Sequence, residues 1–298
     1  MDQAQQLRNV TKMNHAEQRT NSRVVTVTSG KGGVGKSNIS VNLAVQLRKQ
    51  GKRVLILDAD FGLANVEVMF GAIPKFNLSD FIYRGKNIRE VITPGPLDIG
   101  FISGGSGIMG LNDLKREQIM SLVNAIEELN HLADYIIIDT GAGISGQVME
   151  FVLASPEVIL VSAPEPSSLT DSYSLLKTLY NSPNFRKEET TVHIVSNRVS
   201  SAEEGKAVFD KLNSVVEEFL HGSLNYLGMI PQDAALEKAV RQQKPVSMTE
   251  PNAKSSKAFE VLTGNLINGT HNQISPHRGI GQLFSNLLQG RKQENKSV

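Results

Sequence analysis

The sequence predicts an α/β fold built on a mostly parallel, twisted sheet with helices on both faces. From Arg23 onward, short β-branched runs alternate with segments of helical periodicity, which is the order of a parallel sheet with crossover helices. The runs at 54–57, 135–138 and 158–161 are continuously apolar, as strands buried on both faces are. A glycine-rich turn follows the first run and opens the first helix.

The predicted elements follow one another without an internal repeat. Strands are expected at 23–28, 54–57, 97–102, 135–138, 158–161, 191–195 and 226–230. Helices are expected at 38–50, 112–132, 168–181, 203–220 and 254–267. We therefore expect a polar leader at 1–22, one large domain at 23–270 and a tail at 271–298.

Composition excludes several classes of protein. The 298 residues are 40% hydrophobic and 20% charged, and the net charge of +1 indicates no global nucleic-acid footprint. There are no cysteines, which excludes disulfides, iron–sulfur clusters and thiolate zinc sites. No apolar run approaches the ~20 residues of a membrane-spanning helix. The polar N-terminus lacks the apolar core of a secretory signal, so we expect a cytoplasmic protein.

The turn after the first strand has the spacing of a phosphate-binding P-loop, G-x-x-x-x-G-K-[ST]. Its glycines let successive backbone N–H groups surround phosphate oxygens, and the following helix N-terminus adds partial positive charge. Lys36 is expected to reach the β- and γ-phosphates, and the Ser37 hydroxyl to bind Mg²⁺. The predicted nucleotide-binding residues of this loop are Gly30, Lys31, Gly32, Gly33, Val34, Gly35, Lys36, Ser37 and Asn38.

The same glycines also fit a dinucleotide-binding fingerprint. Gly30, Gly32 and Gly35 have G-x-G-x-x-G spacing, and Asp58 lies at a suitable distance downstream. A dinucleotide loop has no use for Lys36 and Ser37, which directly follow the last glycine. The loop therefore predicts binding of a nucleoside triphosphate.

Three aspartates follow two of the predicted strands, where ligands of parallel sheets bind. Asp139 comes after four apolar residues and is expected to act on Mg²⁺ through water, as a Walker B acid. Asp58 closes its strand and is expected to support the outer shell of the metal. Asp60 lies on the loop beyond, where it can face the γ-phosphate and hold the attacking water in line. A single strand-end aspartate often caps a helix or forms a turn, but three beside a P-loop are not explained in that way.

Lys31 is a second lysine, which a P-loop does not need. It is either a solvated charge or a device for phosphate contact. Because it lies too early in the loop to follow Lys36 inward, we expect its side chain to point outward, toward a nucleotide held by another subunit.

Several segments resemble the MinD/ParA ATPases. GKGGVGKS at 30–37 resembles their deviant Walker A motif, LILDADFGLANVE at 55–67 their second acidic motif, and YIIIDTGAG at 135–143 their Walker B and switch region. Two strand-end segments are similar to those that frame adenine in the family, which gives the candidate residues Asn197, Arg198, Pro231 and Gln232. The resemblance covers roughly residues 23–268.

The resemblance implies a monomer–dimer switch with ATP and Mg²⁺ as ligands. Two subunits sandwich the nucleotides, Lys31 of each reaches the phosphates of the partner, and hydrolysis releases the dimer. The implied catalytic residues are Lys31, Lys36 and Asp60, and Ser37, Asp58 and Asp139 are the implied metal-binding residues. Asn38 and Gln232 depart from the family pattern, but an amide at the first and main-chain contacts at the second retain the expected interactions.

The tail contains an apolar helical face at 277–290, formed by Ile280, Leu283, Phe284, Leu287 and Leu288. From His277 to the end, four basic side chains against Glu294 give a net charge of +3. Such a helix is typical of an interfacial membrane anchor, although a terminal helix packed on the core has the same pattern. It resembles the membrane-targeting sequence of the MinD branch, which favours an anchor that associates reversibly with the inner face of the cell membrane.

The leader resembles the D-Q-A-x-x-L-R element of the FlhG branch, also called YlxH or FleN, which regulates flagellar number and placement. The matching residues are Asp2, Gln3, Ala4, Leu7 and Arg8. This resemblance implies that residues 1–22 stimulate the GTPase FlhF, and it makes flagellar basal-body components candidate partners. The alternative for so short a motif is an unstructured tail.

Four other functions are compatible with parts of this sequence. A MinD-like ATPase that positions the division site shares the core motifs. A ParA-like partition ATPase would bind DNA through clustered basic residues, but the lipid-seeking tail would then be surplus, so DNA is not expected. A small-metabolite kinase would need neither Lys31 nor the tail, and a non-hydrolysing adaptor would not need Asp60.

Overall fold

The computed structural model describes residues 22–61, 65–105, 118, 121, 125 and 128–269. Within them the chain forms one eight-stranded sheet. The strands are β1 Arg23–Ser29, β2 Val54–Ala59, β3 Thr93–Pro94, β4 Gly100–Ile102, β5 Tyr135–Ala142, β6 Glu157–Ser162, β7 Thr191–Val199 and β8 Asn225–Pro231. The alternation of strands and helices therefore gives the predicted α/β fold.

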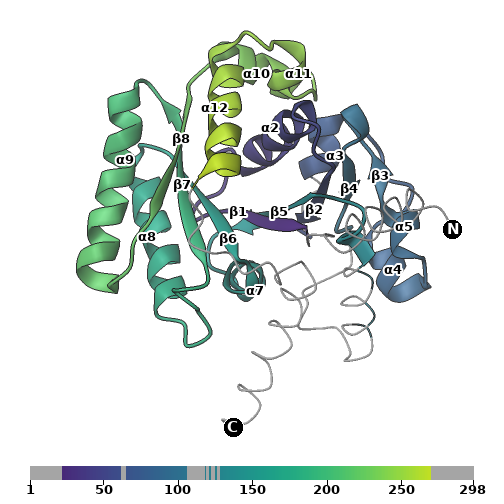
Figure 1. Cartoon of the computed structure of the whole chain (residues 1–298), viewed down its shortest axis with the longest axis horizontal. Coiled ribbons are helices and arrows are strands. Elements are labelled where there is room, and N and C mark those ends of the chain that lie inside the picture. The colour runs from purple at the N-terminus through teal and green to yellow at the C-terminus, as the bar shows by residue number, and fades with distance from the viewer. Residues whose placement is uncertain are drawn as a thin grey trace, which may run out of the picture.

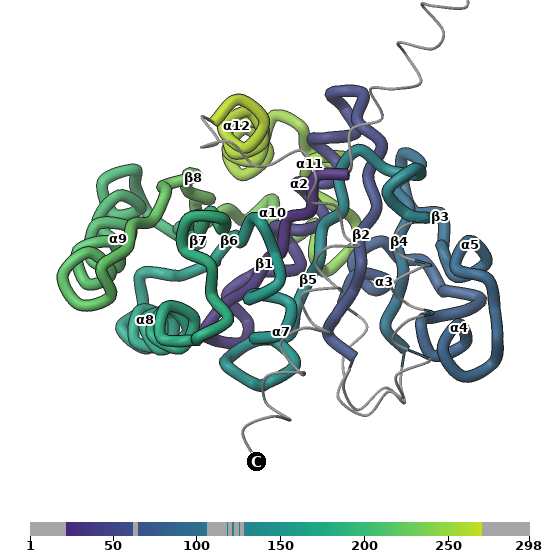
Figure 2. Tube along the Cα trace, turned by 60° about the horizontal axis from the view of Figure 1, so that its bottom comes forward, coloured from purple at the N-terminus to yellow at the C-terminus, as the bar shows by residue number. Residues whose placement is uncertain are grey.

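The strand order is β3-β4-β2-β5-β1-β6-β7-β8, which Figure 2 shows from one edge to the other. All neighbouring pairs are parallel except β3 with β4, where Thr93 pairs with Phe101 in an antiparallel bridge. Strand direction turns progressively from β2 to β8 across Figure 1, as expected for a twisted parallel sheet. The mostly parallel, twisted sheet of the sequence prediction is confirmed.

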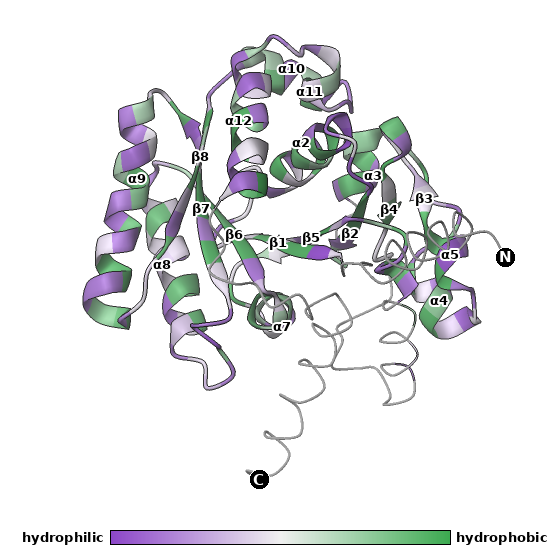
Figure 3. Ribbon diagram, viewed as in Figure 1, coloured by the Kyte–Doolittle hydropathy of each residue, from purple (hydrophilic) through white to green (hydrophobic). Residues whose placement is uncertain are grey.

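Helices cover both faces of this sheet (Figure 1). They are α2 Lys36–Lys49, α3 Asn65–Phe70, α4 Leu78–Arg84, α5 Ile88–Val91, α7 Gly146–Ala154, α8 Pro166–Tyr180, α9 Ala202–Val215, α10 Ala234–Arg241, α11 Val246–Thr249 and α12 Lys254–Asn268. Hydrophilic and hydrophobic residues alternate along α8 and α9, the pattern of helices with one face on a sheet and one in water (Figure 3). Serine side chains cap α7 and α9, since Ser145 accepts from Val148 N and Ser201 from Glu204 N.

The apolar core lies in two layers, one on each side of the strands. On one side α2 and α12 contribute buried side chains such as Leu43 and Phe259. On the other, α7 and α8 contribute Phe151 and Leu175. Burying each such side chain stabilises the fold by about 2 kcal/mol. The P-loop helix α2 is thus held in the core along its length, which fixes the position of its N-terminus.

Several predicted elements differ from the structure in their bounds, among them the strands expected at 97–102 and 135–138. The strand expected at 97–102 begins only at Gly100, because Leu97 and Asp98 adopt φ values of 56° and 57°, which no strand accommodates. The strand expected at 135–138 is longer in the structure, since β5 continues as far as Ala142, with Thr140 paired to Ala59.

Three other predictions fall largely outside the described residues. These are most of the helix at 112–132, the leader before Ser22 and the tail after Gly269. Among the residues that the structure does describe, no helix is long and apolar enough to cross a membrane.

Candidate active site

The glycine loop connects the end of β1 to the start of α2, as predicted. Gly35 is the residue before the first turn of α2 and has φ +100°, a conformation that favours glycine. Gly30 packs so closely on α8 that a Cβ there would lie 2.2 Å from the Asp171 carbonyl. Inside the loop, Ser29 Oγ donates to the carbonyl of Lys31 at 2.7 Å. The loop is therefore fixed by its own backbone and by its fit against α8.

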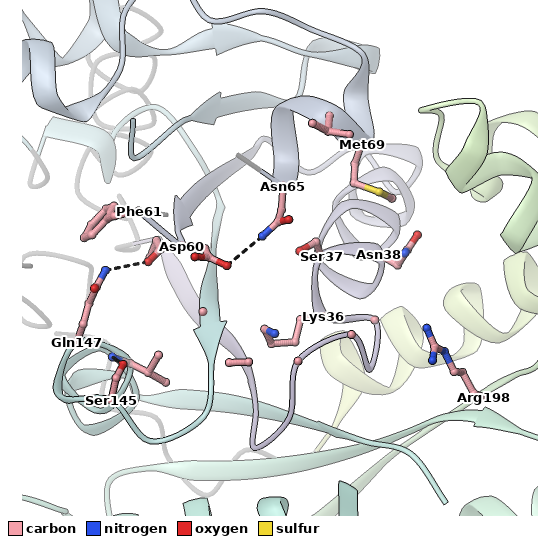
Figure 4. A pocket seen from close by; sticks show the side chains of 18 residues that line it. Lys36, Ser37, Asn38, Asp60, Phe61, Asn65, Met69, Ser145, Gln147 and Arg198 are labelled. Carbon is pink, nitrogen blue, oxygen red and sulfur yellow. Dashed lines mark hydrogen bonds between the residues drawn. The ribbon is translucent and has the colours of Figure 1, made fainter. Parts of the chain in front are cut away.

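A pocket of about 610 Å³ opens beside this loop (Figure 4). In Figure 4, Lys36 extends into the space between the loop and Asp60, and Arg198 lies at the opposite end. The residues that line the pocket are Gly32, Gly33, Gly35, Lys36, Ser37, Asn38, Ala59, Asp60, Phe61, Asn65, Val68, Met69, Gly141, Ala142, Ser145, Gln147, Val148 and Arg198. The structure thus brings the P-loop and the second acidic motif to one cavity.

Lys36 and Asp139 are both buried at the base of the site. Ser40 Oγ, one turn along α2, donates to Asp139 Oδ1 at 2.9 Å. Burial raises the pKa of Asp139 to about 6, and this outweighs the Ser37 and Ser40 hydroxyls and the Lys36 ammonium, which lower it. Burial also lowers the pKa of Lys36, against the opposing effect of Asp139 and Asp60. The neighbouring groups therefore do not fully offset the effect of burial on the pKa of either Asp139 or Lys36.

Asp58 lies beside Asp139 on the adjacent strand and is also buried. Its carboxylate accepts the backbone N–H of Asp60 at 3.2 Å and that of Val66 at 3.1 Å. Burial, followed by repulsion from Asp139, raises the pKa of Asp58 to about 8 despite these two bonds. Each of these two buried carboxyls thus holds its proton to a higher pH than an ordinary aspartate does in the absence of a cation.

Asp60 lies beyond the end of β2 and faces the pocket, as expected. Asn65 Nδ2, on the first turn of α3, donates to Asp60 Oδ2 at 3.1 Å, which Figure 4 shows as a dashed line. Gln147 Nε2, on α7, donates to the Ala59 carbonyl at 3.3 Å. Helices α3 and α7 therefore hold the segment that carries Asp60 from both sides.

Lys31 does not line the pocket of its own chain. Its Nζ donates to Ser167 Oγ at 2.7 Å and lies 3.2 Å from Glu165 Oε2, at the N-terminus of α8. Both charged side chains are partly exposed, at 37% for Lys31 and 53% for Glu165. The expectation that Lys31 points away from its own phosphate site agrees with this geometry.

The four adenine-framing candidates separate into two groups. Arg198 lines the pocket, whereas Asn197, Pro231 and Gln232 do not. Asn197 is 3% exposed, and Gln232 N donates to the Val199 carbonyl at 2.9 Å. The end of β7 thus lies beside the P-loop, with β8 paired to it, but only one of these four side chains lines the cavity.

The donor set fits a Mg²⁺ ion bound together with a nucleotide. Asp139 Oδ2 and Asn38 Oδ1 are buried and, among the described residues, have no hydrogen-bond partner. The described residues contain no group of three His, Cys, Asp or Glu side chains able to hold a metal alone. Mg²⁺ is usually held by one or two protein oxygens plus phosphates and water, which is the arrangement that these residues allow.

Sequence reasoning missed four residues that orient this site: Ser40, Asn65, Gln147 and Glu165. Asn65 belongs to the second acidic motif, so its spacing of five from Asp60 was an available signal. The other three approach only through folding, since Ser40 meets Asp139 across 99 residues and Glu165 meets Lys31 across 134. The predicted leader and membrane-binding residues lie outside the described part of the chain.

Comparison with known proteins agrees with this arrangement. Residues 25–246 match the family described as the CobQ/CobB/MinD/ParA nucleotide binding domain. The chain is 40% identical over 240 residues to the antiactivator FleN of Pseudomonas aeruginosa, covering 80% of this chain and 84% of FleN. It is 34% identical over 280 residues to the flagellum site-determining protein YlxH of Helicobacter pylori, covering 90% of each. The crystal structure of the cell division ATPase MinD of Pyrococcus furiosus superposes with a TM-score of 0.64 at 26% identity, over 83% of this chain and 98% of MinD.

Proposed function

The chain belongs to the CobQ/CobB/MinD/ParA nucleotide-binding family, and from this premise we propose that it is an ATP-hydrolysing switch that regulates flagellar number or placement. The observation that carries the ATPase proposal is the convergence of Lys36 and Asp60 on one pocket above a buried Asp139. Similarity to FleN and to the flagellum site-determining protein YlxH supports the flagellar role.

The phosphate groups of ATP are assigned to the loop amides and Lys36. Ser37 would bind Mg²⁺ directly, Asp139 would act on its water ligands, and Asp58 would support that shell. When bound, the ion would neutralise charge on the phosphates. The buried Asp139 oxygen without a partner supports this assignment. Asp60, held by Asn65, would orient the attacking water toward the γ-phosphate.

Hydrolysis is proposed to require a second copy of the chain. Lys31 already lies outside its own pocket, held by Ser167 and Glu165 at the rim. In a face-to-face dimer, Lys31 of each subunit would leave this contact and stabilise charge on the phosphoryl group held by the partner. After hydrolysis that charge is lost and the dimer would separate.

The tail and the leader would convert the nucleotide state into location and signalling. Dimerisation would pair two weak anchors at 277–290, and two anchors bind lipid far better than one. The protein would then associate reversibly with the inner face of the cell membrane. Residues 1–22 would stimulate the GTPase FlhF, and basal-body components are further candidate partners.

The first test measures ATP turnover and oligomeric state together. Lys36→Gln should abolish both ATP hydrolysis and ATP-dependent dimerisation, because phosphate contact is lost. Asp60→Ala should hydrolyse little ATP yet accumulate as an ATP-bound dimer, detected by light scattering after size exclusion. A monomeric Asp60→Ala protein in saturating Mg·ATP would contradict the switch.

Membrane association is tested separately, by flotation with vesicles that contain anionic lipid. The Asp60→Ala protein should float with ATP and not with ADP. Phe284→Asp in the same background should dimerise normally but remain unbound. Equal flotation with ATP and with ADP would show that membrane binding does not depend on the nucleotide state.

A division-site role is the second candidate function. The likeness to the P. furiosus cell division ATPase MinD, over 98% of that protein, favours it. A peptide of residues 1–22 distinguishes the two functions, since only the flagellar regulator is expected to accelerate GTP hydrolysis by FlhF.

A further inference from the structure

Asn197 lies at the end of β7, where the sequence predicts a contact with the nucleobase. In the folded chain both ends of its side-chain amide have partners within the protein. Nδ2 donates to the carbonyl of Val34 in the P-loop at 2.7 Å, and Oδ1 accepts the backbone N–H of Arg198 at 2.9 Å. The side chain is 3% exposed and does not line the pocket. One of its two N–H donors and one of its two oxygen lone pairs are therefore committed to the protein itself before any ligand binds.

The contact with Val34 bears directly on the phosphate-binding turn. Val34 precedes Gly35, and every peptide bond among the described residues is trans. In a trans peptide, C=O and N–H point in opposite directions, so fixing the Val34 carbonyl toward Asn197 directs the Gly35 N–H away from it. Gly35 lines the pocket, and that N–H is one of the amides expected to bind phosphate.

Asn197 and Gly35 also fit each other sterically. A Cβ added at Gly35 would lie 2.3 Å from Asn197 Nδ2, closer than side-chain atoms can approach. Gly35 therefore serves two requirements, its φ of +100° and the close approach of this amide. The turn that precedes Lys36 therefore packs directly on the Asn197 side chain.

The other end of the amide holds a strained residue. Arg198 has φ +58° and occupies a break in register between Asn197, which pairs with Ile230, and Val199, which pairs with Pro231. L-residues rarely adopt this conformation without support. The bond from Arg198 N to Asn197 Oδ1 supplies such support, and it is in this conformation that the Arg198 side chain lines the pocket.

We propose that Asn197 is a positioning residue that sets the phosphate-binding loop through the Val34 carbonyl, a role separate from any contact with the nucleobase. The inference rests on the proposed binding of ATP. It assigns to Asn197 an effect on every ligand that carries a polyphosphate, whatever base is attached to it.

The test compares a ligand that has a base with one that has none. Affinities of the full chain for Mg·ATP and Mg·tripolyphosphate are measured by competition with a fluorescent ATP analogue. Asn197→Ala should weaken both, and binding of the base-free tripolyphosphate should fall about tenfold, because one hydrogen bond is lost and the Val34 carbonyl is left without its partner.

Asn197→Asp provides a variant of the same size in case the alanine protein does not fold. It can still accept from Arg198 N but cannot donate to Val34, so both affinities should fall together again. Asn225→Ala, at an exposed asparagine on β8, is the matched control and should change neither. Melting temperatures of all three proteins verify that they are folded.

Two results would overturn the inference. A loss of ATP affinity with tripolyphosphate binding unchanged would show that Asn197 acts only through the nucleoside. Unchanged affinity for both ligands would show that the contact with Val34 does not matter. If instead the wild-type chain fails to bind ATP, it is the proposed function that fails, so the two failures are distinguishable.

Discussion

Both ends of the sheet contain buried carboxyl groups, but the pKa values of these groups shift in opposite directions at the two ends. At the amino end, Glu157 begins β6 and receives two hydrogen bonds from Arg23, at 2.5 and 2.7 Å, with His193 Nε2 at 3.5 Å. Burial would raise the pKa of Glu157, but His193 and Arg23 together lower it. At the carboxyl end, burial raises the pKa of Asp58 to about 8 and that of Asp139 to about 6.

Hydrogen-bond and ion-pair partners, and not burial alone, therefore set the direction in which the pKa of each carboxyl shifts. Glu157 and Asp139 are each 0% exposed, yet only Glu157 faces a guanidinium in bidentate geometry. At the carboxyl end the neighbours are hydroxyls, backbone amides and one lysine whose own pKa is lowered by burial. That end disfavours the negative charge of its carboxylates, which costs stability and suits a site completed by a bound cation.

The largest effect is expected from removing the ion pair between Glu157 and Arg23 at the amino end of the sheet. Glu157→Gln should lower the free energy of unfolding by about 3–5 kcal/mol, because a bidentate ion pair with a fully buried carboxylate is broken. Urea denaturation at neutral pH measures the loss. Asp210→Asn, which removes an exposed ion pair with Lys206, is the matched control and should cost at most about 0.5 kcal/mol. Equal losses in the two variants would mean that the pairing at the amino end contributes little.

The pH dependence of stability should show the contrast directly. A carboxyl whose pKa is raised by folding keeps a proton that the unfolded chain has released, so stability falls as pH rises from about 4 to about 8. Asp58→Asn should reduce that slope in nucleotide-free protein by up to about 1.4 kcal/mol per pH unit. Glu157 has the opposite sign, since its contribution is lost only as pH falls through its lowered pKa.

The control for this pH experiment is Asp98→Asn, at a side chain that is 96% exposed. Thermal melts are recorded across the pH range for wild type and both variants. If Asp58→Asn and Asp98→Asn have the same slope as the wild type, the buried carboxyl does not hold the proton assigned to it.

A smaller effect is expected at the carboxyl end of the sheet, where one substitution should separate ATP binding from ATP hydrolysis. Asn65→Ala removes the donor to Asp60 and should lower kcat for ATP hydrolysis about tenfold, the effect of one hydrogen bond to a charged group. ATP affinity should be unchanged, because Asn65 orients Asp60 and is not assigned to phosphate. Asn65→Gln, which keeps the amide, should recover part of the rate. A fall in affinity with kcat preserved would assign Asn65 to the nucleotide instead.

The smallest effect concerns the exposed ion pair at the rim of the site. Glu165→Gln should change monomer stability by less than about 1 kcal/mol, because both groups are partly in water. It should free Lys31 and lower the protein concentration needed for the ATP-dependent dimer by roughly threefold, measured by sedimentation equilibrium. A higher threshold would mean that Glu165 supports the dimer and does not restrain Lys31.

Much of the fold and of the candidate site could be predicted from the amino-acid sequence. The strand–glycine loop–helix unit, the parallel sheet and the gathering of Asp58, Asp60 and Asp139 near the P-loop follow from local patterns and from one rule of α/β topology. The short strand β3 and the late start of β4 were not predicted. Both depend on the positive φ values of Leu97 and Asp98, which no hydrophobic period reveals.

The type of fold, the phosphate-binding loop and the family can be recognised from the amino-acid sequence, because each depends on contiguous residues whose spacing has a direct physical meaning. Which side chains orient those groups depends on the folded structure. Ser40 meets Asp139, Asn197 meets Val34 and Arg23 meets Glu157 across separations of 99 to 163 residues. The charge state of a buried carboxylate depends on such neighbours, since burial and pairing act over a few ångströms and not along the chain.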